Sequence, residues 1–350
     1  MVLSEQPKDI CILRLSAIGD VCHAVSAVQA IQNHYPAASI TWVIGKVEAA
    51  LLEGLSGVDF VIFDKKLGKA AYKQLKQTFE HRQFDVLLHM QVAFRANLAA
   101  SCIPAKVKVG FDWHRAKEAH SLFINQRIEK QQQAHVLEGF MGFAQAIGVP
   151  ATAPKWQLPV SDSNRAVARQ HLQGLGKTLV IAPAASGPER NWLPRRYAEV
   201  ANYAHSQGFA VVLSGGPTEL EQRLSAEILQ DIDFPVLNLV GKTSLKELLC
   251  VLEQASLVIA PDTGPAHMAV TVGTPVIGLY AHSNPARTGP YLYQDYVVEV
   301  YHQNLQRQYG KSAQQVSWGL RVKGAELMQQ ITTESVIAMF NRVVEEQKLA

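Results

Sequence analysis

A short loop near the start of the chain carries the first group that could do chemistry. Residues 14–20 read RLSAIGD, where an apolar run stops, turns through small residues and gives way to helical spacing. Such a turn exposes backbone N–H groups, and Asp20 behind it could take a proton from an acceptor hydroxyl. An acid in a first helical turn also interacts well with the helix dipole. For this turn alone, that structural role is the commoner explanation.

A second loop, residues 260–267, reads APDTGPAH and again leads from a strand-like segment into the start of a helix. The Thr263 hydroxyl, the following backbone amides and the positive end of the helix form a nest suited to a diphosphate. Gly264 lets a ligand approach closely, and His267 lies in the first helical turn, within reach of the same anion. The alternative is an Asp or Thr cap beside a buried histidine.

Two more loops of the second half follow strand-like segments. Residues 183–192, PAASGPERNW, contain Ser186 and Arg190, a hydroxyl and a guanidinium that could offset phosphate charge without a metal. Residues 214–219, SGGPTE, place Glu219 where it could hold ribose hydroxyls. An ordinary surface loop would explain Arg190 equally well in isolation.

Other motifs argue against competing classes of protein. The GKT at residues 241–243 resembles the end of a phosphate-binding loop, but Val236 stands where that motif needs glycine. The first strand-like segment is not followed by G-x-G-x-x-G, which disfavours a dinucleotide-dependent oxidoreductase. The 4 cysteines lack the paired spacing of a metal knuckle or redox motif, and the 12 histidines lack tight ligand spacing. We therefore expect reduced core thiols and no structural metal.

Composition and length frame the search for elements that position these loops. The chain has 350 residues, 48% of them hydrophobic and 18% charged, which suits a folded enzyme of two domains. Its net charge of +3 is too small to predict a nucleic-acid partner. The apolar stretches are shorter than the ~18–20 residues of a membrane span, and residues 1–9 lack a signal-peptide pattern. We expect a cytoplasmic protein.

Strand-like and helical segments alternate along both halves. This alternation predicts two parallel sheets with helices on both faces, separated by a proline-containing linker within residues 147–163. The fold class is therefore α/β, and ligands are expected at the carboxyl ends of the strands, in a cleft between the domains. The expected strands are 10–15, 40–44, 58–63, 86–90, 107–109, 178–184, 210–214, 257–260 and 276–280, and a final helix spans 333–348.

Taken together, the four loops resemble the heptosyltransferase family of lipopolysaccharide core synthesis, glycosyltransferase family 9, in the family's order and over nearly the whole chain. The resemblance implies a GT-B fold of two Rossmann-like doubly wound domains facing across a cleft. Residues 1–165 would bind the acceptor and 166–330 ADP-heptose, with residues 331–350 packing back on the first domain. It also implies inversion at the anomeric carbon and no required cofactor, with Mg²⁺ stimulating at most.

The same resemblance implies roles for individual residues. Asp20 occupies the position of the family's catalytic base. Arg190 occupies a position that is lysine in well-known members, so a cation is kept there. The implied donor site comprises Ser186, Arg190, Glu219, Thr243, Asp262, Thr263, Gly264 and His267.

Segments 110–118 and 133–138, GFDWHRAKE and QAHVLE, look more like heptosyltransferase I, which adds the first heptose to Kdo on lipid A, than like heptosyltransferase II. Gly139 stands where that branch often has arginine, and the branch acting on a single phosphorylated Kdo looks at least as close. The implied acceptor site comprises Lys65, Lys66, Arg115, Lys117 and His135. Lysine-rich segments around these residues would attract an anionic glycolipid at a membrane surface, although solvated helix faces explain them too.

The expected protein is a monomer, peripheral to the inner face of the cytoplasmic membrane, with ADP-heptose and Kdo-lipid A as partners and no nucleic acid. Three alternatives stay open. These are a heptosyltransferase II or III acting on an already heptosylated core, a nucleotide-sugar binding protein without catalysis, and a nucleotide-sugar epimerase of similar build.

Overall fold

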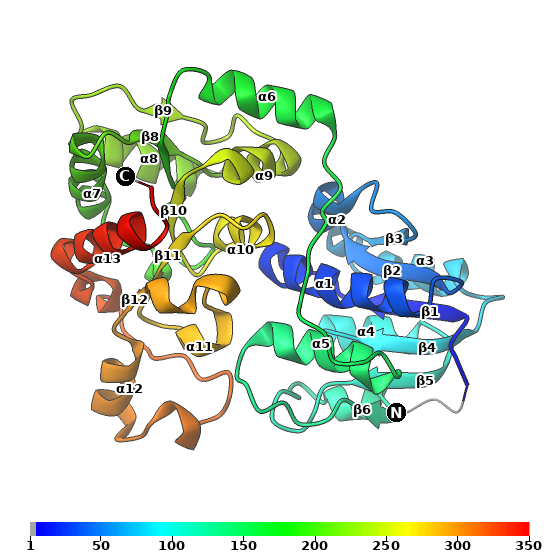
Figure 1. Cartoon of the computed structure of the whole chain (residues 1–350). Coiled ribbons are helices and arrows are strands. Elements are labelled where there is room, and N and C mark those ends of the chain that lie inside the picture. Colours follow the sequence, from blue (N-terminus) through cyan, green and yellow to red (C-terminus); the bar gives the residue numbers. More distant parts are fainter. Residues whose placement is uncertain (1–4, 350) are drawn as a thin grey trace. The chain divides into compact units, whose positions relative to one another are not determined.

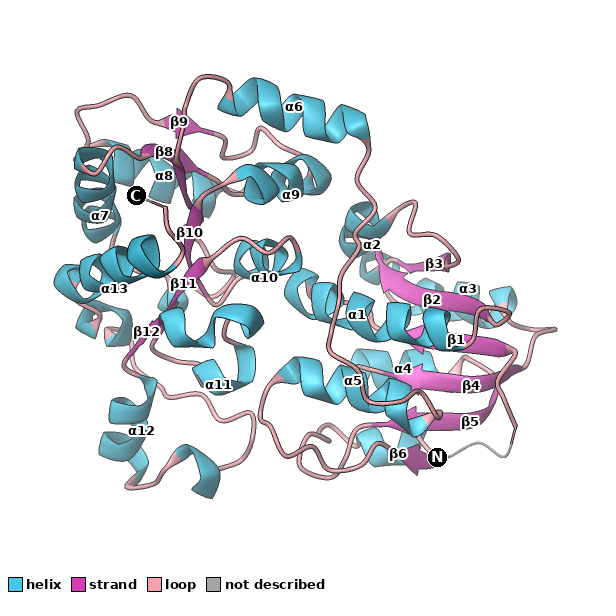
Figure 2. Cartoon of the chain, in the orientation of Figure 1, coloured by secondary structure: helices cyan, strands magenta, loops and turns pink. Residues whose placement is uncertain are grey.

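The computed structural model describes residues 5–349, which form two compact units that divide after Pro159 (Figure 1). Each unit is built on a parallel six-stranded sheet whose strands alternate with helices (Figure 2). The predicted α/β class with two doubly wound sheets is confirmed. The division differs from the predicted boundary after residue 165, because Arg165 lies inside helix α6 (Asp162–Leu172) and pairs with Glu253 of the second unit.

The first unit, unit 1, orders its strands β3-β2-β1-β4-β5-β6. Leu13 at the end of β1 pairs with Val43 on one side and with His89 on the other, so the carboxyl ends of three neighbouring strands meet at one edge. Its elements are β1 (Asp9–Leu13), α1 (Ile18–His34), β2 (Ser39–Gly45), α2 (Lys46–Leu52), β3 (Asp59–Phe63), η1 (Lys65–Leu67), α3 (Lys69–Thr78), β4 (Phe84–His89), α4 (Phe94–Ser101), β5 (Ala105–Gly110), η2 (His120–Phe123), β6 (Gln126–Arg127) and α5 (Val136–Ala146).

Helices cover both faces of the unit 1 sheet. On one face, α3 and α4 contribute Leu75, Ala96 and Ala100 to a core that includes Leu13 and Leu87 from the strands. On the other face, α1 packs against α5 (Figure 1). The central strands β1, β2 and β4 are mostly buried and apolar, as expected for strands covered on both faces.

The second unit, unit 2, orders its strands β12-β11-β10-β7-β8-β9. The elements that matter for the site are those around β7 and β10, which pair directly. The unit consists of α6, β7 (Thr178–Ile181), η3 (Pro188–Arg190), α7 (Pro194–Ser206), β8 (Ala210–Leu213), α8 (Glu219–Leu229), β9 (Leu237–Asn238), α9 (Leu245–Gln254), β10 (Leu257–Pro261), α10 (Gly264–Thr271), β11 (Val276–Tyr280), α11 (Pro285–Thr288), η4 (Tyr291–Tyr296), β12 (Val297–Glu299), α12 (Tyr301–Tyr309), η5 (Ala313–Gln315), η6 (Leu327–Gln330) and α13 (Thr333–Glu346).

The C-terminal helix α13 packs within unit 2, which corrects the expectation that it returns to the first domain. Val336, Phe340 and Val343 are fully buried in the unit 2 core, and α13 contacts α7, β11 and β12. The indole of Trp192 donates to the carbonyl of Ile331 just ahead of the helix, at 3.0 Å. These three residues, spaced four and three apart, form an apolar stripe that packs on the unit 2 sheet. Periodicity predicts such a stripe but does not say which surface it packs against.

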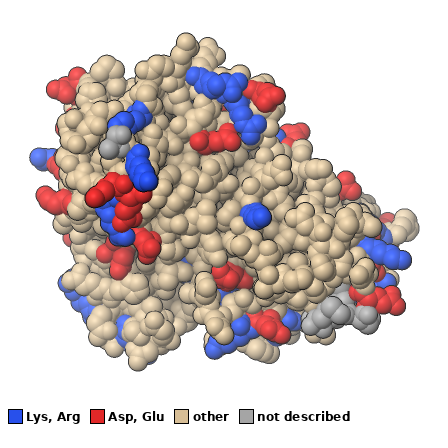
Figure 3. All heavy atoms as spheres, viewed as in Figure 1, with Lys and Arg blue, Asp and Glu red and all other residues tan. Residues whose placement is uncertain are grey.

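Charges of both signs are mixed on the face drawn in Figure 3, where carboxylates lie beside lysines and arginines. Within residues 5–349, no helix combines the length and apolar character that crossing a bilayer requires.

Candidate active site

The carboxylate of Asp20 lies at the carboxyl edge of the unit 1 sheet, in the first turn of α1. Its Oδ2 accepts the backbone N–H of Ala17 at 3.5 Å and forms an ion pair with the Arg14 guanidinium. Arg14 is almost entirely buried, whereas the Asp20 side chain is 33% exposed. The carboxylate is therefore held by protein groups and is also partly open to solvent. A proton acceptor for a bound hydroxyl needs such access.

Arg14 is itself held by the neighbouring strand. Its Nη1 donates to the carbonyl of Met90 at 2.6 Å, just beyond the end of β4. Burial lowers the pKa of Arg14 and the nearby Asp20 raises it, with burial the larger effect. Arginine stays protonated in proteins despite such shifts. Arg14 thus positions Asp20 through a charge-assisted contact, a role that sequence reasoning did not assign.

Gln91 fastens the loop that carries Asp20, and sequence reasoning missed it. The Leu15 N–H donates to Gln91 Oε1 at 2.7 Å, and Gln91 Nε2 donates to Ser16 Oγ at 3.5 Å. On the other side, the Gly45 N–H donates to the Leu15 carbonyl at 2.9 Å, and a side chain at Gly45 would collide with that oxygen. The available signal was a polar residue directly after a buried strand, at the edge where ligands bind.

In unit 2, six of the eight predicted donor residues lie together at the ends of β7 and β10: Ser186, Arg190, Asp262, Thr263, Gly264 and His267. Arg190 Nη1 donates to the carbonyl of Asp262 at 2.8 Å, and its Nη2 donates to Ser186 Oγ at 2.8 Å. The Asp262 carboxylate lies 3.6 Å from Arg190 Nη1 and 3.7 Å from His267 Nε2. The Thr263 hydroxyl donates to the carbonyl of Ala184 at 3.1 Å, which ties the β10 loop to the β7 loop.

These contacts surround the amino end of α10, which begins at Gly264. A helix amino terminus favours anions, and a guanidinium beside it adds a second attraction. Burial raises the pKa of Asp262, but His267, Arg190 and Ser283 together outweigh it and lower that pKa to about 2. Asp262 is therefore ionised at neutral pH.

The remaining donor candidates lie at the same edge of the unit 2 sheet. Glu219 is the first residue of α8 and is exposed. Its neighbour Glu221, not Glu219, closes the preceding loop by accepting the Gly216 N–H at 2.6 Å. The Gly241 N–H donates to the Gly215 carbonyl at 3.0 Å, which brings the loop of Thr243 beside the Glu219 loop. Their contacts with a nucleoside stay predictions.

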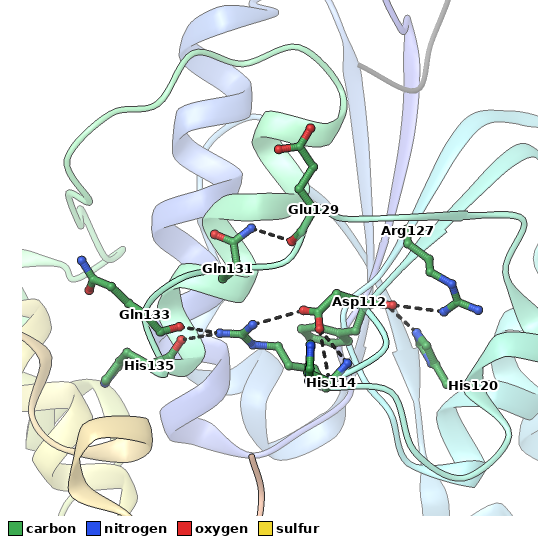
Figure 4. Close-up of polar contacts among 10 residues, drawn as sticks. Asp112, His114, His120, Arg127, Glu129, Gln131, Gln133 and His135 are labelled. Carbon is green, nitrogen blue, oxygen red and sulfur yellow. Dashed lines mark hydrogen bonds and ion pairs between the residues drawn. The ribbon is translucent and has the colours of Figure 1, made fainter. Parts of the chain in front are cut away.

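The acceptor candidates of unit 1 divide into exposed and buried groups. Lys65 and Lys66 are exposed in η1, just after β3, and Lys117 is exposed in the loop after β5. Arg115 is 3% exposed and donates to Asp112 Oδ2 at 3.1 Å and to the carbonyl of Gln133 at 2.9 Å (Figure 4). The structure thus gives Arg115 a role within the loop, and its predicted role as an acceptor ligand stays a prediction.

His135 is also buried and caps helix α5. Its Nδ1 accepts the Leu137 N–H at 3.1 Å, and its ring meets His23 edge to face with centroids 5.1 Å apart. The carbonyl of His135 accepts a hydrogen bond from Arg115 Nη2 at 3.5 Å (Figure 4). A cap in this position fixes where the segment 133–138 begins its helix, and acceptor binding by His135 stays a prediction.

A buried polar cluster supports the loop after β5. The Phe111 N–H donates to His120 Nε2 at 3.1 Å, so the other ring nitrogen, Nδ1, carries hydrogen and donates to Asn97 Oδ1 at 3.0 Å. His89 Nε2 donates to the same oxygen at 2.8 Å, and Asn97 Nδ2 donates to the Glu118 carbonyl at 2.8 Å. Because Nε2 of His120 accepts a hydrogen bond, that imidazole is neutral in this arrangement.

This cluster predicts acid sensitivity of unit 1. Burial lowers the pKa of His89 to about 3 and that of His120 to about 4, from an ordinary value near 6.5. Below pH 6.5 the unfolded chain binds protons that the folded histidines refuse, so stability is complete above 6.5 and is lost as pH falls towards the folded pKa values. We expect a loss of about 1.4 kcal/mol per pH unit for each histidine, measured by urea unfolding at pH 7.5 and 5.

The matched pair for this measurement is His120→Gln and His81→Gln, the latter at an exposed position of the same unit. His120→Gln should lower stability at pH 7.5 and flatten the dependence on pH, whereas His81→Gln should change neither. Equal slopes for wild type and His120→Gln would contradict the assignment of this titration to the cluster.

Within residues 5–349, the structure shows no group of three or more His, Cys, Asp or Glu side chains arranged to hold a metal ion.

Known proteins resemble this chain over nearly its whole length. A family model described as "Glycosyltransferase family 9 (heptosyltransferase)" matches residues 72–317. The chain is 43% identical to the lipopolysaccharide core heptosyltransferase OpsX of Haemophilus influenzae, over 98% of this chain and 99% of that protein. It is 24% identical to lipopolysaccharide heptosyltransferase 1 of Escherichia coli K12, over 85% and 95%.

The structure also resembles that of E. coli heptosyltransferase WaaC with ADP. The TM-score is 0.70 at 20% identity, covering 95% of this chain and 99% of that chain. At this level of identity the likeness concerns the fold, which is GT-B.

Proposed function

The chain belongs to glycosyltransferase family 9 and is a heptosyltransferase of lipopolysaccharide core biosynthesis, and on that premise we propose that it moves L-glycero-D-manno-heptose from ADP-heptose to Kdo, or to Kdo-phosphate, of lipid A. The observation that carries this proposal is a pair of sites, one in each unit, at the carboxyl edges of the two sheets. One holds an ion-paired, partly exposed Asp20. The other holds Arg190 beside the amino end of α10.

In the proposed reaction, Asp20 accepts the proton of an acceptor hydroxyl, whose oxygen attacks the anomeric carbon of the heptose. A carbon–oxygen bond forms on one face of the sugar while the bond to ADP breaks on the other, so the configuration inverts. ADP leaves with the electron pair. Arg190 and the α10 amides stabilise the charge that develops on its diphosphate, since fixed donors aimed at developing charge lower the barrier.

The other residues of the donor site take supporting roles in this proposal. Ser186 and Asp262 hold the Arg190 guanidinium in place, Thr263 and Gly264 shape the diphosphate nest, and His267 balances Asp262. Glu219 and Thr243 contact the nucleoside. We propose that no cofactor is required, that Mg²⁺ stimulates at most, and that a monomer works at the inner face of the cytoplasmic membrane without any nucleic-acid partner.

Release of ADP from ADP-heptose tests the function, measured with purified protein and three acceptors: Kdo-lipid A, its Kdo-phosphate form, and lipid A that already carries heptose. We expect release only with a Kdo terminus and formation of a heptosylated lipid detectable by mass spectrometry. Release independent of acceptor would instead indicate hydrolysis or epimerisation. Preference for the heptosylated acceptor would assign the chain to a later step of core assembly.

A further inference from the structure

Helix α4 of unit 1 presents large apolar side chains to solvent. Phe94 is 53% exposed and Leu98 is 36% exposed, one helical turn apart. The opposite side of the helix, with Ala96, Ala99 and Ala100, is buried against the sheet. Since residues four apart share one face of a helix, Phe94 and Leu98 form an exposed apolar stripe.

The short helix η2 extends this stripe. Leu122 is 82% exposed, whereas the next residue, Phe123, packs on the core beneath α4. Helix η2 contacts α4, and the turn before it is tied to α4 because Asn97 Nδ2 donates to the Glu118 carbonyl at 2.8 Å. Leu122 therefore lies exposed on an element that packs against α4, on a backbone fixed by the polar cluster.

Cations flank the apolar side chains. Helix α3 contacts α4, and the Tyr72 hydroxyl donates to the Arg95 carbonyl at 3.5 Å. Lys69, Lys73 and Lys76 are exposed along α3, and Arg95 and Lys117 are exposed around α4 and η2. Residues 65–79 contain 5 lysines and no Asp or Glu. Apolar groups between cations match the chemistry of an anionic bilayer surface, where side chains enter the interface and lysines meet lipid phosphates.

We propose that this surface, the apolar–basic patch of Phe94, Leu98, Leu122, Lys69, Lys73 and Arg95, docks unit 1 on an anionic lipid bilayer. A second copy of the chain is a poorer occupant, because a symmetric contact would bring the two lysine rows together. An exposed apolar patch rimmed by polar groups marks an interaction surface, and the excess of cations selects an anionic one.

The patch reaches the edge of the sheet that carries Asp20. Phe94 begins α4 only three residues after Gln91, whose side chain binds the N–H of Leu15 in the Asp20 loop. A bilayer touching Phe94 would therefore place its headgroups at the edge where a lipid-anchored acceptor must present its hydroxyl. That connection to the acceptor rests on the proposed function, whereas docking itself does not.

Sedimentation with vesicles tests docking directly. The probes are vesicles of phosphatidylethanolamine with phosphatidylglycerol and vesicles of phosphatidylcholine alone. We expect binding to the anionic vesicles only, weakening as salt rises. Leu122→Ser should weaken it at least tenfold, from the loss of an inserted apolar side chain. The pair Lys69→Gln and Lys73→Gln should weaken it by about fivefold for each lysine.

Two exposed residues outside the patch supply matched controls. Val47 is 61% exposed on α2, and Lys311 is exposed in unit 2. Val47→Ser and Lys311→Gln should bind vesicles as the wild type does. Docking through the patch is overturned if wild-type protein does not bind anionic vesicles, or if Leu122→Ser and Val47→Ser bind equally. It is also overturned if Leu122→Ser dissociates a dimer, detected by size-exclusion chromatography, because the patch would then be a self-interface.

A transfer assay separates this inference from the proposed function. With acceptor embedded in anionic vesicles, Leu122→Ser should lower the rate at least tenfold, whereas with a deacylated, water-soluble acceptor it should match the wild type. Absence of transfer from ADP-heptose to either acceptor would refute the proposed function and leave the vesicle-binding result standing. A Leu122→Ser rate reduced equally on both acceptors would overturn the docking role.

Discussion

Asp20→Asn is expected to lower kcat by about 10²- to 10⁴-fold, the range for loss of a general base. Asparagine keeps the shape of the side chain and an oxygen that can accept from Arg14, but it cannot take the proton of the acceptor. Affinity for ADP, measured by isothermal titration calorimetry, should stay within twofold of the wild type, because the proposed nucleotide site lies in unit 2 and Asp20 lies in unit 1. Single-turnover transfer of heptose measures the chemical step directly.

Two companions distinguish a lost base from a lost scaffold. Asp20→Ala leaves the buried Arg14 guanidinium without its carboxylate partner, so we expect a lower melting temperature in addition to the lost rate. Asp20→Glu keeps a carboxylate one methylene further out and should retain measurable activity. If Asp20→Asn were as active as the wild type, Asp20 would be only a first-turn acid of α1.

Arg190→Met is expected to weaken ADP-heptose binding and to lower kcat/KM by about 10²- to 10³-fold. Arg190 is the one arginine or lysine among the predicted donor residues, and methionine removes its charge at similar length. Arg190 is also one of the groups that lower the pKa of Asp262 to about 2. Without Arg190, the Asp262 carboxylate keeps only His267 and Ser283 as the groups that lower its pKa. Steady-state kinetics against ADP-heptose concentration separates the effect on KM from that on kcat.

Arg190→Lys and Glu189→Gln complete this series. The Arg190 guanidinium contacts both Ser186 and the carbonyl of Asp262. Lysine keeps the charge, but its single ammonium group does not reproduce this two-sided contact as well. We expect Arg190→Lys to recover most of the activity and Glu189→Gln, at an exposed neighbour in the same short helix, to leave it unchanged. Activity of Arg190→Met near the wild-type level would remove the phosphate role.

Much of the architecture could be predicted because it follows from local patterns. Alternating apolar strands and amphipathic helices admit few arrangements other than parallel sheets covered on both faces. Loops after those strands then fall at one edge of each sheet. Asp20 in unit 1 and Arg190, Asp262 and Thr263 in unit 2 are therefore found where the sequence predicts.

Contacts between residues far apart in the chain could not be predicted in this way. Arg14 is six residues from Asp20, yet its place depends on the carbonyl of Met90. Gln91 holds a loop 76 residues away. Helix α13 has a clear apolar stripe, but the sequence does not say which sheet the stripe covers, and only the structure places it on unit 2.

The chain by itself determined its class, its two sheets and the loops that bear the chemistry, because strand and helix periodicity and the types of loop residues are local properties. The tertiary structure decided which polar side chains stay open to a ligand. Arg115 and His135 have the chemistry of acceptor ligands and are buried with partners in the protein, and their binding of an acceptor stays a prediction. Lys65, Lys66 and Lys117 remain exposed, since burial depends on how distant segments pack and not on the residue type.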